Sequence, residues 1–242
     1  MLYQPRFYRN WVSSDLVSFT VRDGQTDIFI SAEKNLKDDT ERFVKRYRAH
    51  IADYIEKNPQ FEKSLTPLPE DKHAPEIIKA MLKASAAVGV GPMAAVAGAI
   101  SEFVGRDLLK LTHQVILENG GDLFIKTDKT RNIGIYAGDS PLSGKIAIKI
   151  KPGSRSLGLC TSSGTVGHSL SFGNADAVSV IAASASLADA CATAVCNMVR
   201  KKEDIEKALS FAKNVEGVIG CVVIYKDNMG TIGDVEFSEG VV

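Results

Sequence analysis

The sequence has no long hydrophobic run and no excess of charge of either sign. Its 242 residues carry 29 basic and 29 acidic side chains, so its charge balance gives no attraction to nucleic acid or to an anionic membrane. The longest weakly polar stretch, residues 84–100, contains Pro92 and is too short to span a bilayer. The first residues open no apolar run of the kind a signal peptide needs. We therefore expect a cytoplasmic protein that binds neither nucleic acid nor membrane.

Cysteine is scarce, and its spacing excludes the common local metal and redox motifs. The four cysteines are Cys160, Cys191, Cys196 and Cys221, and none forms a Cys-x-x-Cys pair. In a cytosolic chain they are expected to be reduced, and we interpret at least three of them as small buried hydrophobic side chains. The Walker and dinucleotide-binding fingerprints are also absent, because the required lysine and glycine spacings are missing.

Strand and helix signals fill most of a chain with ordinary globular composition. Hydrophobic residues make up 45% and charged residues 24%, as is typical of globular domains. An Asp23-Gly24 turn signal predicts a hairpin at residues 16–30, and an apolar stripe predicts a helix that runs to about residue 56. Because predicted strands come in neighbouring pairs as well as between helices, the pattern favours an α+β fold over a doubly wound parallel sheet.

We interpret residues 1–242 as a single domain in three parts. The N-terminal hairpin and helix occupy about residues 1–63, a Pro-containing linker residues 64–75, and the candidate motifs residues 76–242. In this last part we predict helices at 76–87, 94–104, 187–201 and 203–213, and strands at 115–118, 123–125, 133–136, 146–150, 178–181 and 218–225. The Gly/Ser/Thr-rich residues after Gly153 are predicted to form a loop.

One predicted helix carries a carboxylate and a hydroxyl on the same face. Asp189 and Thr193 are four residues apart, which places them one turn apart on a helix. Their oxygens are hard donors of the kind that Mg²⁺ or Ca²⁺ prefers. An Asp favoured in a first helical turn, followed by a packed Thr, gives the same spacing. Spacing alone favours this structural interpretation.

Glycine gathers before and within the helix predicted at residues 94–104. Gly89 and Gly91 precede Pro92, and Gly98 lies inside the helix. Exposed N–H groups at a helix start can hold a phosphate, and small residues permit the close approach of a ligand or of another backbone. A helix packed tightly against a sheet has the same composition, so both interpretations stay open.

A glycine-rich run provides a third candidate. The sequence Asn119-Gly120-Gly121-Asp122 is typical of a tight turn between two strands. It is equally typical of a backbone that lies close to a nucleotide, with Asp122 orienting the ligand. Spacing does not decide between these two interpretations.

A hydroxyl-rich segment provides a fourth candidate for a binding site. Thr161, Ser162, Ser163 and Gly164 can form a phosphate-binding loop. His168, which follows them, is either an acid–base group or an ordinary polar surface residue. We predict that residues 89–93, 119–122 and 160–167 line one cleft, because small residues cluster at these three places.

Taken in order, these motifs resemble those of the ApbE flavin-transferase superfamily. The matching pieces are the Gly-Gly-Asp turn at residues 120–122, the Thr-Ser-Gly motif at residues 161–164, His168, and the Ala-Asp-Ala-x-x-Thr-Ala helix at residues 188–194. This resemblance covers roughly residues 85–200, and the whole chain resembles an uncharacterised ApbE-related family. It implies an ApbE-like α+β fold with largely antiparallel sheet packed by helices.

The resemblance also implies a ligand and an ion. FAD or FMN would lie between the glycine-rich elements, and Mg²⁺ would be held by Asp189 and Thr193. The transferases move FMN from FAD to a protein Thr or Ser, a phosphoryl transfer that depends on positioning and charge neutralisation. Here Ala97 replaces the family's lysine, Glu102 its aspartate, and Ser171-Phe172 its Asp-Pro element. We therefore expect nucleotide binding without flavin transfer.

Two alternatives remain open. The ApbE-like fold can serve sulfur metabolism, such as sulfide assimilation into homocysteine, with Cys160 as the sulfur carrier beside the Thr-Ser-Ser-Gly segment. Alternatively, the chain is a non-catalytic subunit that works with a protein partner, and its glycine-rich loops are only turns. The sequence leaves the oligomeric state open in each case.

Overall fold

The computed structural model of the chain describes residues 6, 9, 15–166 and 171–240. The helices are α1 (Lys37–Lys57), α2 (Gln60–Lys63), α3 (Glu76–Val88), α4 (Val96–Leu108), α5 (Ala185–Met198) and α6 (Ile205–Lys213), with 3₁₀ turns η2 (Pro92–Ala95) and η3 (Lys202–Asp204). The strands are β1 (Val17–Asp23), β2 (Thr26–Ala32), β3 (Val115–Asn119), β4 (Asp122–Lys126), β5 (Arg131–Gly134), β6 (Ile146–Ile150), β7 (Leu157–Ser162), β8 (Ala177–Ala182), β9 (Val218–Tyr225), β10 (Asn228–Gly233) and β11 (Phe237–Glu239).

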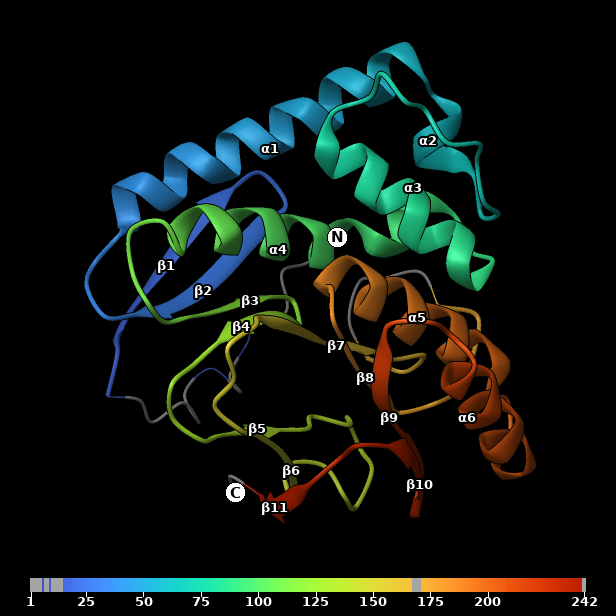
Figure 1. Cartoon of the computed structure of the whole chain (residues 1–242). Coiled ribbons are helices and arrows are strands. Elements are labelled where there is room, and N and C mark those ends of the chain that lie inside the picture. Colours follow the sequence, from blue (N-terminus) through green and yellow to red (C-terminus); the bar gives the residue numbers. More distant parts are fainter. Residues whose placement is uncertain (1–5, 7–8, 10–14, 167–170, 241–242) are drawn as a thin grey trace.

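A large sheet with strand order β1-β2-β3-β4-β7-β8-β9-β10 forms the centre of the fold. Every neighbouring pair in it is antiparallel. A second sheet has the order β11-β6-β5 and is also antiparallel. The α+β class and the largely antiparallel sheet predicted from the sequence are confirmed (Figure 1).

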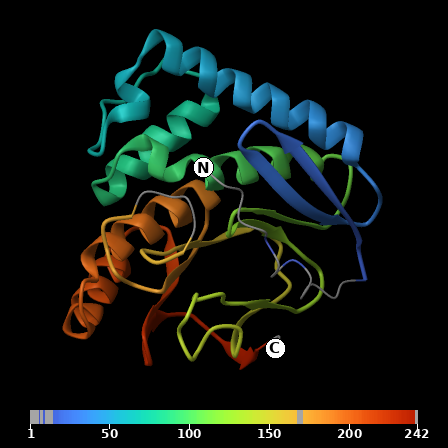
Figure 2. The ribbon, with the colours of Figure 1, turned by 180° about the vertical axis from the view of Figure 1, so that it is seen from behind.

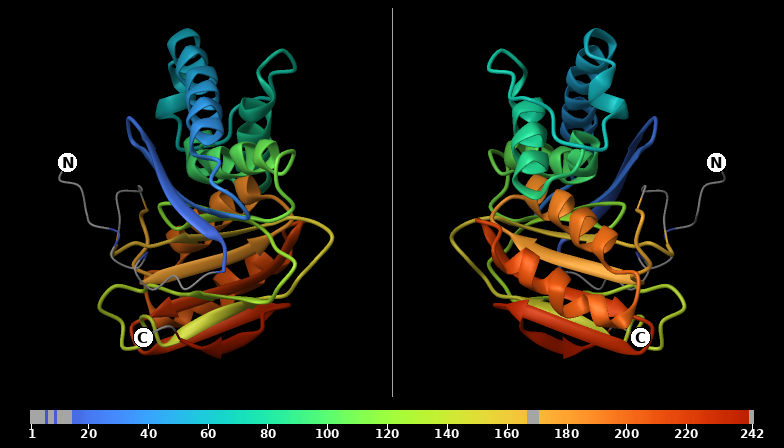
Figure 3. Two further views of the ribbon diagram at one scale, coloured as in Figure 1. Left: turned by 90° about the vertical axis from the view of Figure 1, so that its left-hand side faces the viewer. Right: turned by 90° about the vertical axis from the view of Figure 1, so that its right-hand side faces the viewer.

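The helices cover one face of the large sheet, and the three-stranded sheet covers part of the other (Figure 3). Helix α4 packs on β3 and β4, α5 on β7 and β8, and α6 on β9 and β10, while α1 lies over α4 and β1. The view from behind in Figure 2 shows the same arrangement of layers. Because both faces of the central strands are covered, the side chains of β8 are buried on both sides.

Two hydrophobic cores follow from these layers. The larger lies between the helices and the large sheet and includes Ile30, Leu117, Phe124 and Val180. The smaller lies between the two sheets and includes Ile125, Ile148 and Leu159. Side chains alternate along a strand, so Phe124 and Ile125 of β4 enter different cores. The same alternation decides which polar side chains of β3, β4 and β7 face helices α4 and α5.

Most elements lie close to their predicted residues, with one important exception. The hairpin of β1 and β2, helix α1 and the strand at β9 agree with the sequence prediction. The prediction of a loop through residues 160–162 is wrong, because these residues end β7, a central strand paired with both β4 and β8. The small and apolar residues of Leu157–Ser162 have a weak preference for strands. This segment forms a strand because it is buried between β4 and β8 and pairs with both.

No single helix in the described part of the chain is long and apolar enough to cross a membrane. Taken together, α3 and the η2–α4 segment reach that length and composition, but they are bent by 107° at the break between them.

Candidate functional site

Four elements meet near the N-terminal end of α4. They are that helix end itself, the first half of α5, the turn between β3 and β4, and strand β7. Strands β4 and β7 pair so that Asp122 lies opposite Cys160, and α5 packs on both β7 and α4. Residues far apart in the sequence thereby become neighbours.

The Asn119-Gly120-Gly121-Asp122 segment forms a tight turn, which is one of the two interpretations that its sequence left open. Strand β3 ends at Asn119 and β4 begins at Asp122. Gly120 and Gly121 have φ angles of 71° and 102°, which favour glycine because a Cβ would be strained there. The Asn119 side-chain nitrogen donates to the Ala97 carbonyl at 3.3 Å, so the turn is tied to the start of α4.

Gly98 is explained by the packing of α4 against α5. A Cβ at this position would lie 2.3 Å from the carbonyl oxygen of Ala185 and 2.7 Å from Cβ of Asp189. Because no side chain intervenes, the Gly98 N–H donates to Oδ2 of Asp189 at 2.8 Å. The N-terminal N–H groups of α4 therefore point at a carboxylate of the chain itself.

The carboxyl groups of Asp122 and Asp189 are both buried in this region. Burial raises the pKa of Asp122, and the nearby Asp189 raises it further. Burial also raises the pKa of Asp189, although hydrogen bonds from the Gly98 and Ala97 N–H groups oppose this. Among the described residues, neither carboxyl forms an ion pair with Lys, Arg or His. The described part of the site thus holds two buried acids and no balancing cation, an arrangement that is costly when both are charged.

Asp189 and Thr193 share one face of α5, as their spacing predicts, and both are buried. Within the described ranges, no group of three or more His, Cys, Asp or Glu side chains is arranged to hold a metal ion. The donor chemistry, carboxylate plus hydroxyl, nevertheless fits Mg²⁺ or Ca²⁺ rather than zinc. An ion here would need further oxygen ligands from a bound molecule, backbone carbonyls or water.

Cys160 lies in the centre of this region, but its surroundings suit a structural thiol. It is fully buried, and its Sγ donates to the Ala185 carbonyl at 3.4 Å. Burial raises the pKa of this thiol well above its ordinary value, and the Asp122 and Asp189 carboxylates raise it further. A reactive cysteine instead needs an electropositive, accessible environment.

The remaining residues of the Thr161-Ser162-Ser163-Gly164 run lie on different sides of the sheet and loop. Thr161 bonds with Ser179 of β8, their hydroxyl oxygens 2.8 Å apart. Ser162 faces α5, where its buried hydroxyl makes no hydrogen bond of standard geometry with any described residue. Ser163 shapes the following loop, because its hydroxyl accepts from the N–H groups of Thr165 and Val166.

Four further predicted residues have structural explanations or lie outside the described residues. Gly89 ends α3 with a φ of 77°, and a Cβ on Gly91 would lie 1.8 Å from the Ser64 carbonyl oxygen. Gly164 donates its N–H to the Ala175 carbonyl. Their assignment as ligand contacts stays a prediction. His168, the predicted acid–base residue, lies outside the described residues.

Two side chains of α4 support the site without having been chosen from the sequence for this role. The Ser101 hydroxyl donates to the Asp122 carbonyl at 3.0 Å. Glu102 accepts bonds of 2.7, 3.0 and 2.9 Å from the Ser184 hydroxyl and from the N–H and hydroxyl of Ser186. Glu102 therefore caps α5 from a neighbouring helix. Sequence gives no signal for this, because 82 residues separate Glu102 from Ser184.

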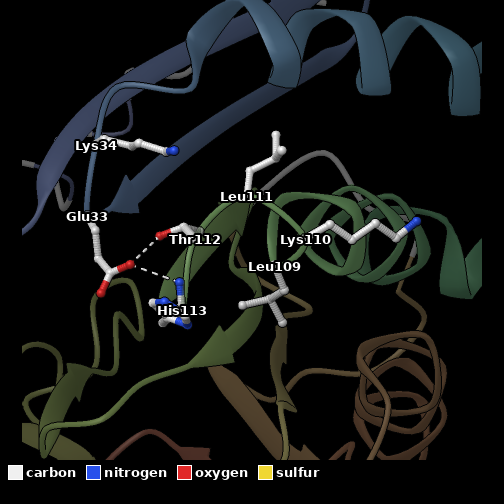
Figure 4. Close-up of a pocket in the computed structure, with 7 residues that line it drawn as sticks. All are labelled: Glu33, Lys34, Leu109, Lys110, Leu111, Thr112 and His113. Carbon is white, nitrogen blue, oxygen red and sulfur yellow. Dashed lines mark hydrogen bonds between the residues drawn. The ribbon is translucent and has the colours of Figure 1, made fainter.

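A shallow hollow lies elsewhere, at the C-terminal end of α4 (Figure 4). Its volume is about 320 Å³. The Glu33 carboxylate there already accepts from the Thr112 hydroxyl and the His113 N–H, both at 2.8 Å. At 1.5 Å per residue, the length of α4 separates this hollow from Gly98. It contains none of the predicted site residues.

Comparison with known proteins identifies the family of the chain. A protein-family model described as AbpE bacteria matches residues 9–236. The chain belongs to an ApbE-related family. The chain is similar to a UPF0280 protein of Methanococcus aeolicus, with 43% identity over 213 residues that cover 83% of this chain and 86% of that protein. Another, from Methanocaldococcus jannaschii, is 39% identical over 217 residues, with 87% and 88% covered.

Solved structures show that this ApbE-related chain has the fold of the flavin transferases. The apo form of the flavinyl transferase ApbE of Pseudomonas stutzeri has a TM-score of 0.54 and 14% identity, with 93% of this chain and 94% of that chain covered. The flavin transferase ApbE of Vibrio cholerae has a TM-score of 0.53 and 14% identity, with 93% and 97% covered. At this identity the likeness establishes the fold alone.

Proposed function

We propose that this ApbE-related protein binds a flavin nucleotide together with a divalent cation, and that the two meet at the carboxyl groups of Asp122 and Asp189. The observation that carries the proposal is the pair itself. Two buried carboxyl groups without a cationic partner are unfavourable unless a proton or a metal ion neutralises them. A divalent cation would neutralise both.

The composition of the site favours an ion delivered with a phosphate. Asp189 and Thr193 would supply oxygen ligands to the ion, with Asp122 close by. Mg²⁺ requires six oxygens and is usually shared between one or two carboxylates and a substrate phosphate. Because the described residues offer few ligands here, a nucleotide phosphate would complete the coordination. The printed names of the structural neighbours, flavin transferases, favour a flavin as that nucleotide.

Flavin transfer to a protein is not part of the proposal. Ala97 stands where the flavin transferases that this chain resembles have a lysine, and its hydrogen bonds come from its backbone: the carbonyl accepts from Asn119, and the N–H donates to Asp189. Ala97 has no charge to stabilise a phosphoryl transition state. Mass spectrometry after incubation with FAD, Mg²⁺ and an acceptor peptide should find no added FMN, while a true transferase in the same assay should flavinylate it.

The sulfur-carrier alternative receives no support from the surroundings of Cys160. A carrier thiol must be reached by its sulfur donor and must ionise. Cys160 is fully buried, and its pKa is raised by burial and by two neighbouring carboxylates. We therefore assign it a packing role.

Calorimetry with FAD tests the proposal. The wild-type protein should bind FAD, and Mg²⁺ should strengthen this binding relative to EDTA. Asp189→Asn removes one charge with little change in shape, so Mg²⁺ should no longer matter. Asp107→Asn is the matched control, because Asp107 is also largely inaccessible to solvent but lies near the other end of α4. If wild type and Asp189→Asn bind FAD equally and Mg²⁺ has no effect on either, the proposal is wrong.

A further inference from the structure

Two arginines from the start of the chain lie at the turn between β3 and β4. Their partners, Asp27 of β2 and Glu118 of β3, alternate with residues such as Ile28 and Leu117 that enter the helix-side core. Arg6 and Arg9 therefore approach the turn from the sheet face opposite α4. Asp122 and Asp189 lie on the α4 side of the same turn.

Arg9 is held firmly. Its Nε donates to Glu118 Oε2 at 2.7 Å, its Nη1 to Asp27 Oδ1 at 2.7 Å, and its Nη2 to the Asp27 carbonyl at 2.8 Å. The other oxygen of Glu118 accepts from the Gly121 N–H at 2.7 Å. Arg9 thus fixes Glu118, and Glu118 fixes the backbone of the turn.

Arg6 is held at one end only. Its Nη1 donates to the Asp27 carbonyl and lies 4.0 Å from Glu118 Oε1. Its Nη2 has no hydrogen-bond partner among the described residues. This nitrogen lies 3.3 Å from the position that a Cβ of Gly120 would occupy. About a fifth of the Arg6 side chain is exposed.

The charges around the turn are divided between its two sides. On the outer side, three described arginines, Arg6, Arg9 and Arg22, lie at ion-pair distance from two acids, Asp27 and Glu118. On the α4 side, two buried carboxyl groups have no cationic partner among the residues that the structure describes. A ligand with phosphates at the tip of the turn would have Arg6 on one side and, on the other, the Asp122 and Asp189 carboxyl groups, which could bind its metal ion.

We propose that Arg6 binds a phosphate of the nucleotide at the tip of the turn, and that Arg9 is the positioning residue that holds the turn in place. This inference rests on the proposed function. The planar guanidinium suits phosphate, because its parallel N–H groups match the phosphate oxygens. Gly120 leaves room at the contact, since any side chain there would crowd Nη2 of Arg6.

The test compares two flavins that differ in phosphate. FAD carries a pyrophosphate and riboflavin carries none, and both are followed by quenching of flavin fluorescence in the presence of Mg²⁺. Arg6→Ala should weaken FAD binding about 10-fold, as expected for one charge-assisted contact, and leave riboflavin binding unchanged. The difference between wild type and Arg6→Ala should shrink as KCl is raised. Arg6→Lys should recover part of the loss.

Control variants separate this contact from general damage to the fold. Arg42→Ala removes an exposed arginine of α1 and should bind both flavins like wild type. Arg9→Ala should weaken binding of both flavins, because it loosens the turn rather than a phosphate contact. Thermal unfolding checks that Arg6→Ala stays folded.

The outcomes are distinct. If wild type binds FAD and Arg6→Ala binds it equally well, the inference is wrong while the proposed function stands. If Arg6→Ala weakens FAD and riboflavin equally, Arg6 makes no phosphate contact and the inference is also wrong. If wild type binds no FAD, the proposed function fails and the inference fails with it.

Discussion

Replacement of Asp189 by asparagine should separate stability from ligand binding. In the absence of a cation, the folded protein must bury the Asp189 carboxyl next to that of Asp122. Asparagine keeps the shape and an oxygen that can accept from the Gly98 N–H, but it carries no charge. We expect Asp189→Asn to be more stable than wild type at pH 8 in EDTA, and to lose the stabilisation that Mg²⁺ and FAD give to wild type.

The size of the effect follows from the pKa. Burial raises the pKa of Asp189 from its ordinary value of 3.8 to about 7, which corresponds to at most about 4 kcal/mol. A carboxyl whose folded pKa is raised binds its proton more tightly in the folded state, so stability falls as pH rises from about 4 to about 7. The new amide N–H groups need acceptors, which removes part of the gain. We therefore expect the free energy of unfolding of Asp189→Asn to exceed that of wild type by about 2 kcal/mol at pH 8, and by less at pH 5.

Urea denaturation measures this difference directly. Wild type and Asp189→Asn are unfolded at pH 5 and pH 8 in EDTA, and again at pH 8 with Mg²⁺ and FAD. Ligands stabilise the form that binds them, so wild type should become the more stable protein in the last condition.

Asp107→Asn is a control whose expected effect on stability at pH 8 is opposite to that of Asp189→Asn. Although burial opposes it, the hydrogen bonds from Lys110 and Tyr47 and the charge of Arg46 hold the pKa of Asp107 below its ordinary value. Its carboxylate therefore stabilises the fold at neutral pH, and this contribution is lost only as pH falls through the folded pKa. Asp107→Asn should be less stable than wild type at pH 8. A finding that Asp189→Asn is also less stable at pH 8 in EDTA would refute the reasoning about the uncompensated pair.

Three further predictions concern packing. Gly98→Ala should lower the free energy of unfolding, measured in urea, by more than about 2 kcal/mol, because its Cβ would meet the Ala185 carbonyl at 2.3 Å. Gly89 has open space around it, so Gly89→Ala should lower this free energy by only about 1 kcal/mol, from the strain of its positive φ. Equal losses in the two variants would contradict this. Glu102→Ala should lower the free energy of unfolding by about 3 kcal/mol, because the start of α5 loses its acceptor, and a loss no larger than that of a surface variant would count against the cap. All four cysteines are buried, so an aromatic disulfide reagent should label none of them until urea unfolds the chain, and rapid labelling of Cys160 in the folded protein would reopen the sulfur-carrier hypothesis.

Local chemistry in the sequence was sufficient for much of the fold. The Asn119-Gly120-Gly121-Asp122 segment forms a tight turn, one of the two interpretations that its sequence left open, because glycine adopts positive φ without the strain that a Cβ would cause. Ser184, a residue type that commonly caps helices, accepts a bond from the Leu187 N–H and precedes the first residue of α5. In both cases the determining contacts lie within a few residues. The order of the motifs was also sufficient to indicate the ApbE-related family, which the comparisons then established.

The tertiary structure alone decided where the candidate residues lie and which of them are neighbours. Strand β7 exists because β4 and β8 pair with it, and this placed Cys160 in a buried strand instead of a loop. Asp122 and Asp189 became neighbours although 67 positions separate them, since α5 packs across β4 and β7. Arg9 reached Glu118 across 109 positions. Spacing in a sequence reports contacts along one helix or one strand, whereas a site assembled from several elements depends on how those elements pack against one another.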